Sequence, residues 1–113
     1  GARGDTYGMR VSTETALSYA GKAIDLHPGN YEVWLHRGSL FVALISSGYP
    51  NATENAYSDL VQAKMLAPLR PDIVYQEALL EIARGRKVDA RIALERAIEL
   101  KPDYAQALSL LKS

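Results

Sequence analysis

Few side chains in this sequence are of the kinds that do chemistry, and none is spaced for it. His27 and His36 are the only histidines among the 113 residues, and there is no cysteine. Neither histidine has a second ligand nearby at a spacing that holds a metal ion. A nucleophilic serine needs a positioned base, and no glycine-rich turn frames any of the serines. We therefore expect no enzymatic activity, no metal site and no cofactor in this chain.

A local basic cluster is formed by "RGRK" at residues 84–87, with Arg91 and Arg96 following. One interpretation is a contact surface for an acidic partner or for lipid head groups, and the favoured one is a solvated turn between helices. Over the whole chain the 13 basic and 13 acidic residues cancel. Nucleic acids and anionic membranes attract proteins with a net positive field. A nucleic-acid partner is therefore not expected.

The composition is that of a globular domain. Apolar residues make up 48% of the chain and charged residues 23%, which is ordinary for such proteins. The longest uninterrupted apolar run, residues 40–45, is far shorter than the roughly 20 residues that span a bilayer. This predicts one domain without direct membrane insertion. Residues 1–12, which open with "GARG" and not with Met, are expected to be a cloning remnant or a linker. The compartment is left open.

A six-residue pattern recurs three times along the chain. It is "AIDLHP" at 23–28, "AKMLAP" at 63–68 and "AIELKP" at 97–102, so that its prolines lie 40 and then 34 residues apart. The same two spacings separate Ala16, Ala56 and Ala90. A period near 34 residues indicates stacked units of supersecondary structure.

Each unit is predicted to end in a helix that stops at its proline, because proline cannot continue a helix. In the two later units a second helical pattern comes first, at residues 31–45 and 72–83. Glycine inside a helix costs up to ~1 kcal/mol. Gly38 therefore predicts a close approach between helices, with Trp34 as a buried knob one turn away. Pro71 fits the start of the later first helix, and Gly85 fits its end.

These residues resemble the tetratricopeptide repeat family. The matching positions are Trp34, Gly38, Phe41, Ala56, Leu60, Ala63 and Pro68 in one unit, Ala78, Ala90, Leu94, Ala97 and Pro102 in the next, and Ala16, Ala20, Ala23 and Pro28 in an incomplete earlier one. The resemblance implies an all-α fold, a right-handed α-solenoid of about two and a half helix-turn-helix repeats with a C-terminal capping helix.

The expected domain covers residues 13–113. It divides into the second helix of a partial repeat at 13–28, a repeat at 31–68 with an inserted loop at 46–53, a repeat at 71–102 and the capping helix at 103–113. Asn51 and Asp103, each followed three residues later by Glu or Gln, predict side-chain caps for the helices that they precede.

The helix at 13–28 lacks a first helix of its own in this division. Leu17, Ala20 and Ile24 are then expected to be partly bare. This predicts a homodimer through the N-terminal helix, or a missing upstream segment.

In the tetratricopeptide family the first helices of successive units line a concave groove, and a partner protein or peptide binds there. Carried onto this chain, the groove positions are Glu32, Leu35, Ser39, Val42, Asp72, Tyr75, Gln76, Leu79 and Ile82. This surface is apolar with an acidic edge, and it lacks the Lys and Arg that hold a peptide's terminal carboxylate in some family members. It therefore predicts an apolar helix or extended segment as the guest. In the alternative interpretation the capping helix fills the groove.

A second functional hypothesis comes from residues 30–68, which also resemble the repeat tail of bacterial membrane proteins of the O-antigen ligase or polymerase type. The chain is then a soluble regulatory or assembly domain, and the catalytic part lies outside this fragment. Helical repeats that read one nucleic-acid base each need polar readers on the inner face. Leu35, Leu79 and Ile82 have the wrong chemistry for that.

Overall fold

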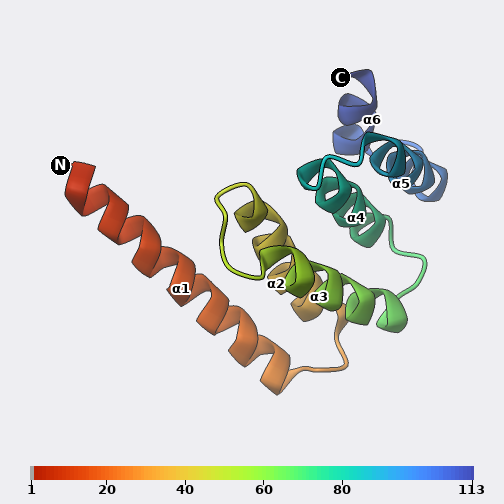
Figure 1. Cartoon of the computed structure of the whole chain (residues 1–113). Coiled ribbons are helices and arrows are strands. Elements are labelled where there is room, and N and C mark those ends of the chain that lie inside the picture. Colours follow the sequence, from red (N-terminus) through yellow and green to blue (C-terminus); the bar gives the residue numbers. More distant parts are fainter. Residues whose placement is uncertain (1) are drawn as a thin grey trace.

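The computed structural model describes the backbone of residues 2–113 and the side chains of residues 12–113. This described part consists of six helices joined by turns and loops, without a strand. In chain order the helices are α1 (Ala2–Leu26), α2 (Tyr31–Ile45), α3 (Ala52–Leu66), α4 (Pro71–Ala83), α5 (Lys87–Leu100) and α6 (Ala105–Lys112). They follow one another through space from α1 at one end to α6 at the other (Figure 1).

The helices pair as the repeated pattern predicts, which confirms the all-α solenoid of helical repeats. α2 packs most extensively on α3, and α4 on α5, while α2 also contacts α4 and α6 contacts α5. The alanines of the repeated columns are buried in both complete units, namely Ala56, Ala63, Ala90 and Ala97. A methyl group at these positions lets two helices approach closely.

Two apolar clusters form the core. The first joins Phe41 and Val42 of α2 to Ala56 and Leu60 of α3, and it also contains Leu80 of α4. The second gathers α4, α5 and α6, and its buried members are Val74, Ala78, Leu94, Ala97 and Ala107. Because α4 contributes to both clusters, the apolar interior is continuous from one unit to the next.

Gly38 marks the close approach between α2 and α3 that the sequence predicts. A Cβ atom built at this residue lies 3.1 Å from Cδ2 of Leu60 and 3.2 Å from Cβ of Asp59. The prediction that Trp34 is a buried knob beside this glycine is wrong. Trp34 is half-buried and stands in neither core cluster. Its indole N–H donates to the carbonyl oxygen of Pro28 at 2.8 Å, because a tryptophan N–H needs a polar partner. The side chain therefore closes the turn before α2.

The connections within the two units differ in length. Residues 84–86 join α4 to α5, and the longer connection at residues 46–51 joins α2 to α3. Gly85 and Gly48 both have a φ of 77°, a left-handed conformation that glycine adopts without a steric penalty. The loop also reaches back to α1, because the Tyr49 hydroxyl donates to Oε1 of Glu14 at 3.0 Å.

Both predicted side-chain caps are wrong. Asn51 has a φ of 60°, in the left-handed region, and its side chain makes no capping hydrogen bond to α3. A capping side chain needs an extended backbone, which this residue does not have. Asp103 stands too early in the chain, because Tyr104 directly precedes α6 and makes no side-chain cap.

The first helix differs from its expected form. It begins at Ala2 and not at residue 13, and the side chains of the expected linker up to residue 11 lie outside the described residues. Ala20 and Ile24, which were expected to be partly bare, are buried. Leu17 is half-buried and packs against the first core cluster. Among the described side chains of α1, the exposed large apolar ones are Tyr19 and Leu26.

Candidate partner-binding face

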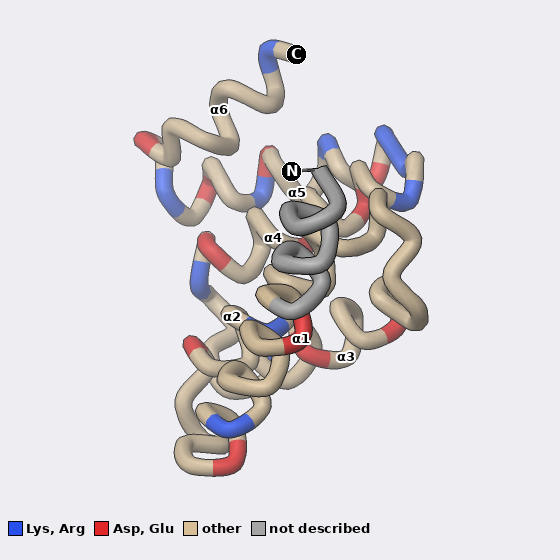
Figure 2. The backbone as a smooth tube through the Cα atoms, turned by 90° about the vertical axis from the view of Figure 1, so that its left-hand side faces the viewer, with Lys and Arg blue, Asp and Glu red and all other residues tan. Residues whose placement is uncertain are grey.

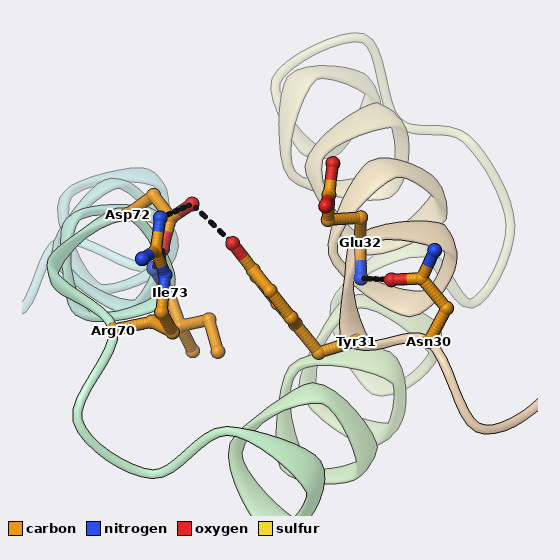
Figure 3. A network of polar contacts seen from close by, with 6 residues as sticks. All are labelled: Asn30, Tyr31, Glu32, Arg70, Asp72 and Ile73. Carbon is orange, nitrogen blue, oxygen red and sulfur yellow. Dashed lines mark hydrogen bonds and ion pairs between the residues drawn. The ribbon is translucent and has the colours of Figure 1, made fainter.

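The N-terminal ends of α2 and α4 are tied to each other by polar contacts (Figure 3). The hydroxyl group of Tyr31 donates to Oδ2 of Asp72 at 3.2 Å, and the other oxygen of that carboxylate accepts from the backbone N–H of Ile73 at 3.0 Å. Asn30 caps α2 by accepting from the backbone N–H of Glu32 at 2.9 Å. The two first helices are therefore held in a fixed relation where the predicted groove begins.

Arg70 offsets the charge of Asp72 in this network. Its Nε lies 3.4 Å from Oδ1 of Asp72, and its guanidinium lies 5.3 Å from the centre of the Tyr31 ring. The loss of solvent around the phenol, together with the negative Asp72 carboxylate, raises the pKa of Tyr31 above its ordinary 10.0. The acidic edge expected from the sequence is thus partly neutralised, and Glu32 is its exposed carboxylate.

Tyr75 packs against the segment that leads into the capping helix. Its ring centre lies 5.2 Å from that of Tyr104, and both rings pack on the second core cluster. Burial is the main reason that the pKa of Tyr104 is raised, and Asp72 and Tyr75 add to the effect. The C-terminal segment therefore covers part of the predicted groove at Tyr75.

The structure places the nine predicted groove residues at three levels of burial. Glu32 and Ile82 are exposed, Val42 lies in the core, and the other six are half-buried: Leu35, Ser39, Asp72, Tyr75, Gln76 and Leu79. Leu35 and Leu79 both pack against the first core cluster, which joins the apolar part of α2 to that of α4. Val42 supports this surface from below and is not available for contact.

A buried ion pair beneath α2 escaped prediction from the sequence. Arg37 donates from Nε to Oδ2 of Asp59 and from Nη2 to Oδ1, both at 2.8 Å. Asp59 is only 2% exposed, and its hydrogen bonds are the main reason that the pKa of Arg37 is raised. The spacing in the sequence could have indicated that Asp59 is buried. It stands three residues after Ala56 and four before Ala63, on the same face of the helix as these alanines.

The basic cluster after α4 is matched by acidic side chains. Its ion pairs lie within single helices or at their ends, and they are Arg84–Glu81, Arg86–Asp89, Arg91–Glu95 and Arg96–Glu99, at 3.1 to 4.0 Å. In Figure 2 acidic positions are interspersed among the basic ones along α5. These contacts favour the interpretation as a solvated turn over that of an anion-binding surface.

Neither metal-ligand clustering nor a membrane span is found in the described residues. Within them, no three side chains of His, Cys, Asp or Glu gather as a metal site requires. Of the helices in the same part of the chain, none combines the length and the apolar character that crossing a membrane needs.

Comparison with known families shows a helical-repeat match. Residues 13–44 match the model of the protein prenyltransferase alpha subunit repeat. This stretch covers α1 from Thr13 onward and almost all of α2. In the division into repeat units, α1 is the second helix of one unit and α2 is the first helix of the next. No significant match was found among curated proteins. The match supports a helical-repeat fold, of the kind that protein-interaction scaffolds have. The narrower tetratricopeptide assignment and the likeness to O-antigen ligase tails stay predictions.

Proposed function

We propose that the chain is a protein-interaction scaffold of the tetratricopeptide type. The partner segment lies along the α2–α4 face, which consists of Glu32, Leu35, Ser39, Asp72, Tyr75, Gln76, Leu79 and Ile82. The observation that carries this proposal is the Tyr31–Asp72 hydrogen bond, which holds two neighbouring first helices together. A face that is fixed before binding loses less entropy when a partner binds.

The side chains of this face point to the chemistry of its guest. Leu35 and Leu79 present partly exposed apolar surface, and the exposed Ile82 borders a hollow toward α5 and α6. The neighbouring rings of Tyr75 and Tyr104 offer apolar faces with polar hydroxyl groups, a combination that is frequent where proteins bind each other. Since Arg70 offsets Asp72, Glu32 is the acidic residue available to a guest. We therefore propose an apolar segment that carries a basic residue opposite Glu32.

The family match is in keeping with this proposal. The matched repeat is named for the alpha subunit of an enzyme, and a subunit works in contact with another chain. For this chain, that supports a partner protein over a small molecule.

The proposal can be tested with peptides selected from a random library on the immobilised chain, with affinities measured by fluorescence anisotropy. Ile82→Asp places a charge on the α2–α4 face, and Ile92→Asp places the same charge on α5, where the isoleucine is also exposed (45% for Ile82 and 61% for Ile92). We expect Ile82→Asp to weaken binding at least about tenfold, which is ~1.4 kcal/mol. Ile92→Asp should leave the affinity within about twofold of the wild-type value.

A second substitution checks the expected charge preference. Glu32→Lys should disfavour the selected peptides that contain Lys or Arg, with the loss reduced at high salt. Circular dichroism confirms that each variant keeps its helix content. Selected peptides that bind Ile82→Asp and the wild-type chain equally well would place the binding surface elsewhere.

A further inference from the structure

The repeat register allows α1 to be compared with α3 position by position. An offset of 40 residues carries Ala16 onto Ala56 and Ala23 onto Ala63. The same offset carries Tyr19 onto Asp59 and Leu26 onto Leu66. These four positions of α1 face the same way around the helix axis, because they are three or four residues apart. We call them the α1 seat.

The α1 seat is more open than its counterpart in α3, except at the end of the helix. Ala56 and Ala63 are fully buried and Asp59 is 2% exposed, whereas Leu66 is 44% exposed. On α1 the two alanines are only half-buried, Tyr19 is 67% exposed and Leu26 is 74% exposed. The cover on α3 is α2, which approaches Asp59 and Leu60 through Gly38. On α1 the neighbouring α2 lies instead on the side of Leu17, Ala20 and Ile24.

The upstream side of α2 is open as well. Leu40 of α2 corresponds to Leu80 of α4 by the same offset of 40 residues. Leu80 is buried in the first core cluster by the preceding unit, whereas Leu40 is half-buried. Beside it lies an apolar hollow of about 230 Å³ between the two helices, lined by Ser12, Thr13, Ala16, Leu17, Leu40, Ala43 and Leu44. The α1 seat and this hollow thus form one uncovered surface.

The two complete units show what covers such a surface. In each of them it is an antiparallel helix with a small residue at its centre, Gly38 in α2 and Ala78 in α4, flanked by larger apolar side chains. We infer that the α1 seat binds an amphipathic helix of this first-helix kind, supplied by another polypeptide. Lys22, whose Nζ lies 5.6 Å from the centre of the Tyr19 ring, favours an acidic residue at the edge of that helix.

A second copy of this chain is a poorer occupant than a separate partner. Its α2 and α4 are already packed in its own core, which leaves α1 as the helix to offer. The face that α1 would present is the α1 seat itself, which has the large Tyr19 near its centre. α2 and α4 have the small Gly38 and Ala78 at that place, so two α1 seats could not approach each other as closely.

The test uses a peptide copy of a helix that already covers this kind of face. The probe is a fluorescein-labelled peptide of residues 70–84, which contains all of α4, and its anisotropy is followed as the chain is added. We expect saturable binding. The same peptide with Ala78→Arg should bind at least about tenfold more weakly, because the central small residue sets the approach of the two helices.

Two neighbouring residues of α1 supply a matched pair of variants. Tyr19→Glu changes the α1 seat, and Ser18→Glu adds the same charge at an exposed position on another side of the helix. We expect the first to weaken probe binding at least about tenfold and the second to leave it within about twofold. Ile82→Asp should also leave it unchanged, which separates this inference from the proposed α2–α4 face.

Three results would overturn the inference. One is the absence of saturable probe binding up to about 1 mM, the weakest affinity worth considering. Another is equal binding by the Tyr19→Glu and Ser18→Glu variants, both shown to be helical by circular dichroism. The third is a dimer in size-exclusion chromatography with light scattering that Tyr19→Glu dissociates, because the occupant is then a second copy.

Discussion

Asp59 and Arg37 form a charge pair whose two members are buried to different degrees. The side chain of Asp59 is 3% exposed and that of Arg37 is 29% exposed. When Asp59 loses its partner, the carboxylate stays in a place that water does not reach. When Arg37 loses its partner, the guanidinium can still turn toward solvent, because long cationic side chains keep their charged end wet. Removal of the two partners should therefore have unequal effects.

At the residue scale we predict that Arg37→Met destabilises the fold more than Asp59→Asn does. Arg37→Met leaves the buried Asp59 carboxylate without its partner, and such a change costs ~3–5 kcal/mol. Asp59→Asn keeps an oxygen that can accept one hydrogen bond from Arg37, so its cost should be about half as large or less. Urea denaturation of the wild-type chain and both variants gives the two differences. Equal losses of unfolding free energy would contradict the asymmetry.

Gly21 in α1 and Gly38 in α2 differ in the space that surrounds them. This difference decides whether replacing each glycine by alanine stabilises or destabilises the chain. A Cβ atom at Gly38 meets Leu60 at 3.1 Å and Asp59 at 3.2 Å, whereas at Gly21 the nearest atom is Nη1 of Arg37 at 4.0 Å. The first contact is tighter than packing allows without movement, and the second is ordinary van der Waals contact.

At the element scale we therefore predict opposite signs for the two substitutions. Gly21→Ala should stabilise the chain by ~0.5–1 kcal/mol, because alanine has less backbone entropy to lose in a helix. Gly38→Ala gains the same term, but it forces α2 and α3 apart at a cost of ~1–3 kcal/mol, so its net effect should be destabilising. Thermal and urea unfolding of both variants measure the signs. Stabilisation by both would show that the approach at Gly38 is not tight.

The elements themselves were predictable where the repeat register and local breakers agree. The pattern predicts a helix at 31–45, and α2 has these bounds. Pro71 begins α4 and Gly85 follows its end, as the sequence indicates. The start of α1 at Ala2 was missed, because the first twelve residues hold three glycines and little apolar periodicity. The failed cap at Asn51 depends on a left-handed backbone that the side-chain types do not reveal.

The candidate face was less predictable than the helices. Register places Leu35, Tyr75 and Ile82 on one side of their helices, but it does not say how far neighbouring segments cover each of them. Tyr104 packs on Tyr75 because of the path of the chain into α6, and Val42 is buried in a cluster to which α2, α3 and α4 all contribute. Such burial is set by tertiary packing, which a local period does not encode.

Across the whole molecule, tyrosines with raised pKa values join different helices. Tyr31 links α2 to α4, and Tyr104 links the start of α6 to α4. The pKa of each is raised above 10.0, mainly because of burial. The folded chain therefore holds protons at alkaline pH that the unfolded chain has released. The stability that these groups contribute is complete below pH 10 and is lost as the pH rises through their folded-state pKa values.

At the scale of the whole molecule we predict that the free energy of unfolding falls above about pH 10. Tyr31→Phe and Tyr104→Phe remove two groups whose ionisation the fold opposes, so the double variant should lose less stability than the wild-type chain between about pH 10 and pH 11. Urea denaturation at several pH values measures this slope, and tyrosinate absorbance follows the ionisation. An unchanged slope in the double variant would assign the alkaline loss to other groups.

The contact between Tyr49 and Glu14 has a mechanical consequence. Glu14 stands midway along α1, between its attachment near Leu26 and its far end at Ala2. At 1.5 Å per residue about 18 Å of α1 extends beyond Glu14. Because Leu17, Ala20 and Ile24 anchor the other half of the helix, the inserted loop and the core together fix the direction of this arm.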